Sequence, residues 1–245
     1  MTSALRLALS AFALAALLLP SSAVGQSADG SRELSLQLQP PVAPFEAVPT
    51  LDCNVDSGDI VAWDLSNGAT TGDHTLLISD LVAAGFTIRT INIAVDSIPP
   101  CLHHLVITTQ AFNACLTSVY PAPLVDLVRN SVRAGLGLFL LNEWGVSCGQ
   151  GSAPIANALG AAWNGNFGAS QTFFAGTDFD PNNPATLFQG VSSWQQFAGS
   201  DYTASVNVVV RTNANLPAMI AGRVERGCVV IAGDSNWIAN NWIGF

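Results

Sequence analysis

The sequence contains no lysine, and its 245 residues carry few charges of any kind. Charged residues make up 10% of the chain, against about 25% in a typical soluble domain. The eight basic residues are all arginines, and the acids outnumber them enough to give a formal net charge of −9. Such a chain lacks the basic patch needed to follow a phosphate backbone or an anionic lipid surface, so we expect neither nucleic acid nor such membranes as partners.

Histidine is also scarce, and none follows His104. No cysteines stand in the C-x-x-C spacing, and His74, His103 and His104 form no zinc-ligand pattern with the cysteines. We therefore expect no metal and no cofactor. Because neighbouring side chains in a strand point to opposite faces, we expect one of His103 and His104 to be packed and the other exposed.

The apolar content, 49%, excludes intrinsic disorder and is enough to build a sizeable core. The N-terminus is typical of a secretory signal peptide: an arginine precedes an apolar run over 7–19, which is short for a bilayer span of about 20 residues. Ala23 and Gly25 fit the −3 and −1 positions of a cleavage site that leaves Gln26 first. An uncleaved membrane anchor is the alternative. The sequence thus predicts a secreted or periplasmic protein that is not membrane-bound after cleavage.

Three regions follow from the composition: a signal peptide over 1–25, an extended arm rich in Pro, Gln and Ser over 26–50, and a single domain over 51–245. In the domain, short apolar runs typical of buried strands alternate with amphipathic helical segments. Strands are predicted at 59–64, 86–92, 104–108, 136–141, 205–211, 218–224 and 228–232, and helices at 74–84, 123–134 and 153–163. In the first helix, Leu76, Leu77 and Leu81 are expected to face the core.

This order predicts an α/β fold: a flavodoxin-like three-layer sandwich with a mostly parallel sheet in the order 2-1-3-4-5. A β-hairpin addition is expected in the C-terminal third, with its turn near 224–228.

Export makes disulfides the default state of the five cysteines, and an odd number leaves at least one unpaired within the chain. Cys53, Cys101 and Cys228 precede predicted strands and so belong to the amino edge of the sheet, whereas Cys115 and Cys148 follow strands. Because a disulfide needs Cα atoms within about 7 Å, we predict the pairs Cys53–Cys101 and Cys115–Cys148, with Cys228 free and buried.

Several segments are similar to glutamine amidotransferase-like domains of the non-catalytic kind. They are VAWDLSNG at 61–68, the helix-Gly-Phe-Thr-strand that follows, VRAGLGLFLL at 132–141 and GDSNW at 233–237. The similarity covers about residues 59–237. It implies the fold of the class I glutamine amidotransferase-like superfamily, in a non-catalytic, secreted branch.

Amidotransferase chemistry in that superfamily needs a cysteine nucleophile directly after the fourth strand and a histidine from a late loop. Here NEWG occupies 142–145, the nearest cysteine is Cys148, and no late histidine exists. We therefore expect no glutaminase activity.

Ligands of open parallel sheets bind at the carboxyl ends of the strands. Three carboxylates are predicted at that edge, each with polar or aromatic neighbours, and Glu143, Asp64 and Asp234 are the catalytic candidates. The candidate ligand-binding residues are Asp64, Ser66, Asn67, Glu143, Trp144, Asp234, Ser235, Asn236 and Trp237. Such residues bind sugars by ring stacking and hydrogen bonds, or hold hard cations. They are also ordinary loop and helix-cap residues.

Three functions fit these observations. The first is an exported, non-catalytic module that binds a glycan or another neutral surface ligand, since a negative site without neighbouring bases favours neutral polyols or cations. The second is an extracellular or envelope hydrolase with a carboxylate or metal site that uses Asp64, Glu143 and Asp234, in which Glu143, following an apolar run, acts as a general acid. The third is a structural part of a secreted assembly, docked through the arm at 26–50 to a surface protein.

Overall fold

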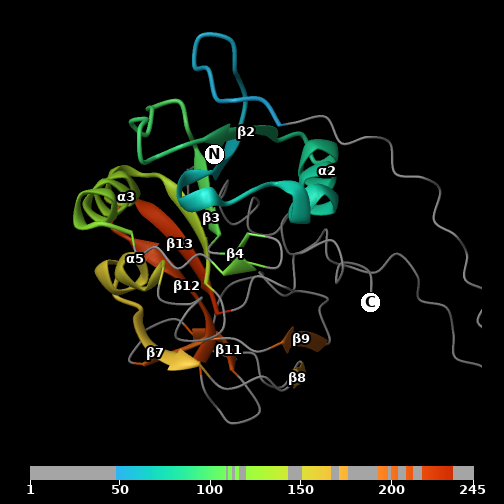
Figure 1. Cartoon of the computed structure of the whole chain (residues 1–245), viewed down its shortest axis with the longest axis vertical. Helices are drawn as coiled ribbons and strands as arrows, with labels where there is room; N and C mark the ends of the chain where they lie inside the picture. The colour runs from blue at the N-terminus through green and yellow to red at the C-terminus, as the bar shows by residue number, and fades with distance from the viewer. Residues whose placement is uncertain are drawn as a thin grey trace, which may run out of the picture.

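The computed structural model describes most of the domain (Figure 1). The described residues are 48–108, 110–111, 114–115, 120–142, 151–166, 171–175, 193–197, 200–203, 208–211 and 217–233.

A seven-stranded sheet in the order β11-β12-β13-β6-β3-β1-β2 forms the centre of the molecule. Its strands are β1 (Ile60–Asp64), β2 (Thr87–Ile91), β3 (His104–Thr108), β6 (Gly137–Leu141), β11 (Val208–Arg211), β12 (Pro217–Val224) and β13 (Gly227–Ala232). Five neighbouring strands run parallel to one another: β2, β1, β3, β6 and β13. Strand β12 pairs antiparallel with β13, and β11 pairs antiparallel with β12. The predicted flavodoxin-like order and the C-terminal hairpin addition are confirmed.

Continuous apolar sequence explains why this sheet is covered on both faces. Every residue of β1 and of β6 is buried. Two core clusters result: the first is built against α3 (Ala122–Ala134) and α5 (Ala153–Ala158), the second against α2 (Thr75–Ala83). Figure 1 shows α2 on one side of the sheet and α3 with α5 on the other. The three-layer arrangement is thus present.

The inward face of α2 differs by one residue from the prediction. Leu77, Ile78 and Leu81 are buried, but Leu76 is 39% exposed. The helix follows a short 3₁₀ turn, η2 (Gly72–His74), and starts at Thr75. Successive helical residues are about 100° apart, so a face centred on Leu77, Ile78 and Leu81 turns Leu76 toward solvent.

The predicted helix over 153–163 is wrong in its second half, since α5 ends at Ala158. Gly160 adopts a positive φ of 87°, a conformation that ends a helix and that glycine takes at little steric cost. The chain then extends as β7 (Ala162–Asn166), which pairs antiparallel with β10 (Ser200–Thr203). The remaining described elements are the pair β4 (Gln110–Ala111) with β5 (Ala114–Cys115), the pair β8 (Gln171–Ala175) with β9 (Ser193–Phe197), and the turn η1 (Ser66–Gly68).

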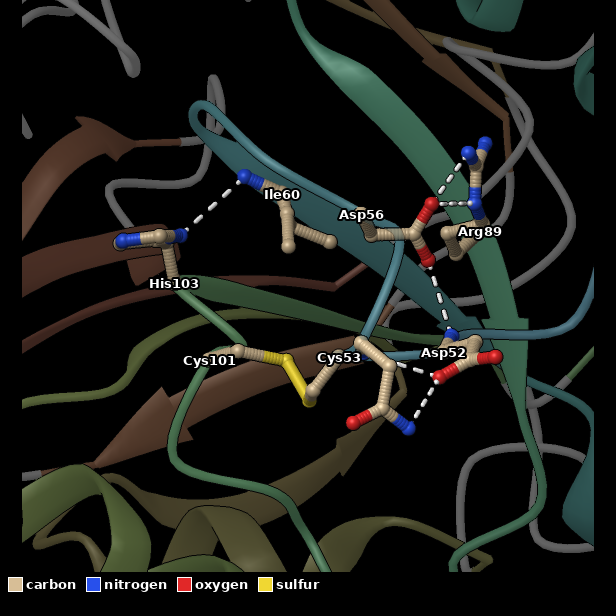
Figure 2. The surroundings of a disulfide bond; sticks show 8 residues. Asp52, Cys53, Asp56, Ile60, Arg89, Cys101 and His103 are labelled. Atoms are coloured by element: carbon tan, nitrogen blue, oxygen red, sulfur yellow. Dashed lines mark hydrogen bonds and ion pairs between the residues drawn. A yellow bond between two sulfur atoms is a disulfide. The ribbon is translucent and has the colours of Figure 1, made fainter.

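A disulfide joins Cys53 to Cys101 at the amino edge, with Cα atoms 5.8 Å apart (Figure 2). This confirms the predicted pair. Cys228 is free, also as predicted, but it is half-buried rather than buried because it lies near the start of β13 beside the exposed Arg223. Cys148 lies outside the described residues, so its pairing with Cys115 stays a prediction.

The chain before β1 is fixed to the outer edge of β2. Thr90 donates its N–H to the Pro49 carbonyl, and its own carbonyl accepts from Leu51. Asp56 forms an ion pair with Arg89 of β2, and this guanidinium lowers the pKa of the Asp56 carboxyl. Residues 26–47 of the expected arm lie outside the described part of the chain. No helix within that part is long and apolar enough to cross a membrane.

Gly227, the first residue of β13, lies directly against the end of α3. A Cβ at this position would overlap the backbone carbonyl oxygens of Val132 and Leu136, which cannot rotate away. We expect Gly227→Ala to lower the free energy of unfolding by about 2 kcal/mol through overpacking, measured by urea denaturation. Gly72→Ala is the control, because its nearest neighbour is the Thr70 hydroxyl at 3.8 Å. Equal losses in the two variants would contradict the overlap.

Candidate functional site

The carboxyl end of β1 carries a fully buried carboxylate, Asp64. Its Oδ1 accepts from the backbone N–H of Ser66 at 2.9 Å and of Ile93 at 3.2 Å. Its Oδ2 accepts from the Ser66 hydroxyl at 2.5 Å and from the Tyr120 hydroxyl at 2.7 Å. An ionised carboxylate has about four acceptor positions. The protein's own donors therefore fill the hydrogen-bonding capacity of Asp64.

Local sequence explains how these donors gather. Asp64 accepts from a backbone N–H two residues on, which is the pattern of an Asx turn and starts η1. Ile93 follows the end of β2, and Tyr120 precedes α3. The Ser66 and Tyr120 hydroxyl oxygens lie 3.3 Å apart. One carboxylate thus connects the ends of two neighbouring strands with the entry to a helix on the sheet face.

The residues at the carboxyl ends of β3 and β6, the next two strands of the sheet, are also polar and buried. Thr108 ends β3 and Asn142 follows β6, and neither is exposed to solvent. Asn142 accepts a hydrogen bond from the Ser152 hydroxyl at 2.9 Å and donates its backbone N–H to the Ala232 carbonyl at 2.8 Å. These contacts fix the exit of β6 to the start of α5 and to the end of β13.

The predicted site residues fall into two groups. Asp64 and Ser66 lie together at the expected edge, but both are buried. Asn67 is part of η1, and its side chain is not among those described. The remaining candidates, which lie outside the described residues, are Glu143, Trp144, Asp234, Ser235, Asn236 and Trp237. The two segments that carry them leave adjacent strands, because Leu141 of β6 is paired with Ala232 of β13.

Sequence reasoning missed Tyr120 and Asn142. The available signals were that Tyr120 is one of two tyrosines and stands just before a predicted helix, and that Asn142 directly follows an apolar strand. Within the described ranges, no group of three His, Cys, Asp or Glu side chains is placed to hold a metal ion.

No protein-family model and no curated protein matches the chain. Among solved structures, it is similar to the mmIFT52 N-terminal domain, with a TM-score of 0.58, 9% identity and coverage of 74% of this chain and 89% of that one. It is also similar to the cytoplasmic protein STM1381 of Salmonella typhimurium LT2, with a TM-score of 0.55, 14% identity and coverage of 77% and 94%.

A further similarity is to the exo-β-1,4-mannosidase Op5Man5 of Opitutaceae bacterium strain TAV5, with a TM-score of 0.52 and 12% identity. The match covers 75% of this chain but only 32% of the mannosidase, so the chain spans about a third of that protein's length. At such identities these likenesses establish the fold alone. None of the three is named as a glutamine amidotransferase, and that resemblance stays a prediction.

The adjacent histidines lie at the opposite, amino edge. His103 is exposed, whereas His104 is half-buried and packs its ring edge-on against Phe86, with centroids 6.3 Å apart. This confirms the expected division. Burial of the His104 ring, with a smaller effect of the neighbouring His103 charge, lowers the pKa of His104 to about 4.

We expect acid to destabilise the fold through His104. The unfolded chain protonates this histidine below a pH of about 6.5, while the folded chain resists until about 4. The free energy of unfolding is therefore at its full value above a pH of about 6.5, and it falls by up to about 3 kcal/mol as the pH drops from there to about 4. Urea denaturation at stepped pH measures the loss. It should shrink in His104→Gln and largely persist in His103→Gln. An unchanged pH dependence in His104→Gln would contradict this origin.

Proposed function

We propose that this chain is an exported binding module without glutaminase or hydrolase chemistry, and that its carboxyl edge takes a neutral glycan or another neutral surface ligand. The main support for the proposal is that four protein donors already fill the hydrogen-bonding capacity of the Asp64 carboxylate. A catalytic carboxylate has to attack the substrate or exchange a proton with it. Asp64 is buried and already holds four donors, so it is suited to organising the edge rather than to reacting there.

The sequence adds two reasons against amidotransferase chemistry. The position after β6 holds Asn142 and Glu143 instead of a cysteine, and no histidine follows His104 to serve as a base. Nucleophile and base are both needed for acyl transfer through a thioester. Their absence in the sequence favours binding over catalysis.

Export is supported by two independent features. The apolar run over 7–19 with a cleavage-like sequence after it is typical of a signal peptide. The disulfide between Cys53 and Cys101 is typical of proteins that fold in oxidising compartments. Together they favour a secreted or periplasmic location.

The ligand class follows from charge and aromatic content. The chain carries a net charge of −9, which disfavours anionic ligands at an edge whose candidate charges are all acidic. Trp144 and Trp237 belong to the segments that leave β6 and β13, and indole rings stack on sugar faces.

A glycan array probed with the chain starting at Gln26, followed by calorimetry with the best neutral oligosaccharide, tests this function. We expect saturable binding that weakens about fivefold in Trp144→Ala and in Trp237→Ala, because a lost stacking contact is worth about 1 kcal/mol. Glu143→Gln should leave binding largely intact.

Val55→Ala is the matched control, since Val55 is 75% exposed and precedes β1 at the other edge. Release of reducing sugar from the oligosaccharide, abolished by Glu143→Gln, would instead establish the hydrolase. Absence of binding to every glycan on the array would reject the ligand class.

A further inference from the structure

A second candidate site lies at the amino edge of the sheet, opposite Asp64, and does not rest on the function proposed above. A cavity of about 600 Å³ opens between the starts of β1 and β3, the end of α3 and the β12–β13 hairpin. Small-molecule sites in proteins have volumes of about 300–1,000 Å³. The cavity is therefore of a size to hold a small organic ligand.

One wall of the cavity is apolar. It is formed by the segment before β3, with Ile98, Pro99, Pro100 and Leu102, and by Leu136 at the start of β6. The Cys53–Cys101 disulfide fixes this segment to the chain that precedes β1 (Figure 2). A covalently fixed proline-rich wall loses little conformational entropy when a ligand binds. It is suited to the hydrocarbon part of a ligand.

Two arginines, both exposed, border the cavity from the hairpin. Arg223 donates its Nε–H to the Glu225 carbonyl at 3.0 Å, which orients the guanidinium and leaves its two terminal nitrogens out of that bond. Arg226 makes no side-chain hydrogen bond or ion pair to any described residue. The Glu225 carboxylate between them pairs with Arg133 at 3.4 Å. The two arginines thus concentrate positive charge at the β12–β13 hairpin, in a chain that has no lysine and a net charge of −9.

His103 supplies a third donor. Its Nδ1 accepts the backbone N–H of Ile60 at 3.2 Å, so the neutral ring carries its hydrogen on Nε2. Figure 2 shows Nε2 at the end of the ring that points away from Ile60. His103 lines the cavity, and it thus has a directed N–H available to an acceptor there.

Negative features on the same cavity limit the charge of the ligand. Asp59 lines it, and so does Gly135 at the carboxyl end of α3, where the helix dipole is negative. Both reduce the excess positive charge of the two arginines to about what one negative charge neutralises, so the second charge of a phosphate ester would be left uncompensated, whereas a monoanion is neutralised. Arginine forks also match the two oxygens of a carboxylate.

We propose that this cavity binds a small organic monocarboxylate, with its carboxylate held by Arg223, Arg226 and the His103 Nε2–H and its apolar body against the proline-rich wall. Calorimetry with phenylacetate as the probe at pH 7 tests the proposal. Saturable binding is expected. It should weaken about three- to fivefold in Arg223→Gln and in Arg226→Gln, because an ion pair to an exposed guanidinium contributes up to about 1 kcal/mol.

Arg129→Gln is the matched control, since it removes the same charge from α3 at a residue that pairs with Asp126 and does not line the cavity. Far-UV circular dichroism checks that each variant is folded, and Arg226→Gln removes no side-chain hydrogen bond or ion pair to a described residue. Phenylacetamide, the neutral isostere, should bind at least about tenfold more weakly, and phenyl phosphate more weakly than phenylacetate. Equal affinity for the amide, tighter binding of the phosphate, no binding of phenylacetate, or full affinity in both arginine variants would each overturn the proposal.

Discussion

The buried Asp64 carboxylate is the constraint on which the arrangement of the carboxyl edge depends. Taking a charge out of water costs several kcal/mol unless hydrogen bonds replace the lost solvent. Here two backbone N–H groups and two hydroxyls do so. They belong to the turn after β1, the exit from β2 and the segment that leads into α3, so satisfying one charge fixes three chain segments. Asn142 has a comparable role at the end of β6, where it joins α5 and β13.

The two edges of the sheet are built from different chemistry. The carboxyl edge places neutral and acidic side chains in the interior, where hydrogen bonds with the surrounding protein hold them. The amino edge is fixed covalently by Cys53–Cys101 and exposes arginines and a histidine around a cavity. Among the described residues, Arg223, Arg226 and His103 are exposed at the amino edge, whereas none of the predicted site residues at the carboxyl edge is cationic. The two ligands proposed above would therefore bind to different groups.

Much of the fold was predictable because its determinants are local. The apolar runs of β1, β3 and β6 need burial on both faces, and that requirement implies a parallel sheet with helices on each side. The Cys53–Cys101 pair followed from the topology. Tyr120 was not predictable, because its hydrogen bond to Asp64 joins residues 56 positions apart. Likewise, the exposure of Leu76 and the early end of α5 depend on how η2 and Gly160 set the backbone, which apolar spacing does not encode.

The most direct test of this account is the free energy of unfolding of Asp64→Asn, measured by urea denaturation beside Asp126→Asn. Asp126 also carries a carboxylate, but in an exposed pair with Arg129 on α3. Loss of the buried charge and of the acceptor for two of its four donors should cost about 3 kcal/mol or more, whereas the exposed pair should cost less than about 1 kcal/mol. Wild-type stability in Asp64→Asn, together with loss of ligand binding or of sugar release, would contradict a structural role for this carboxylate and make it part of a reactive site.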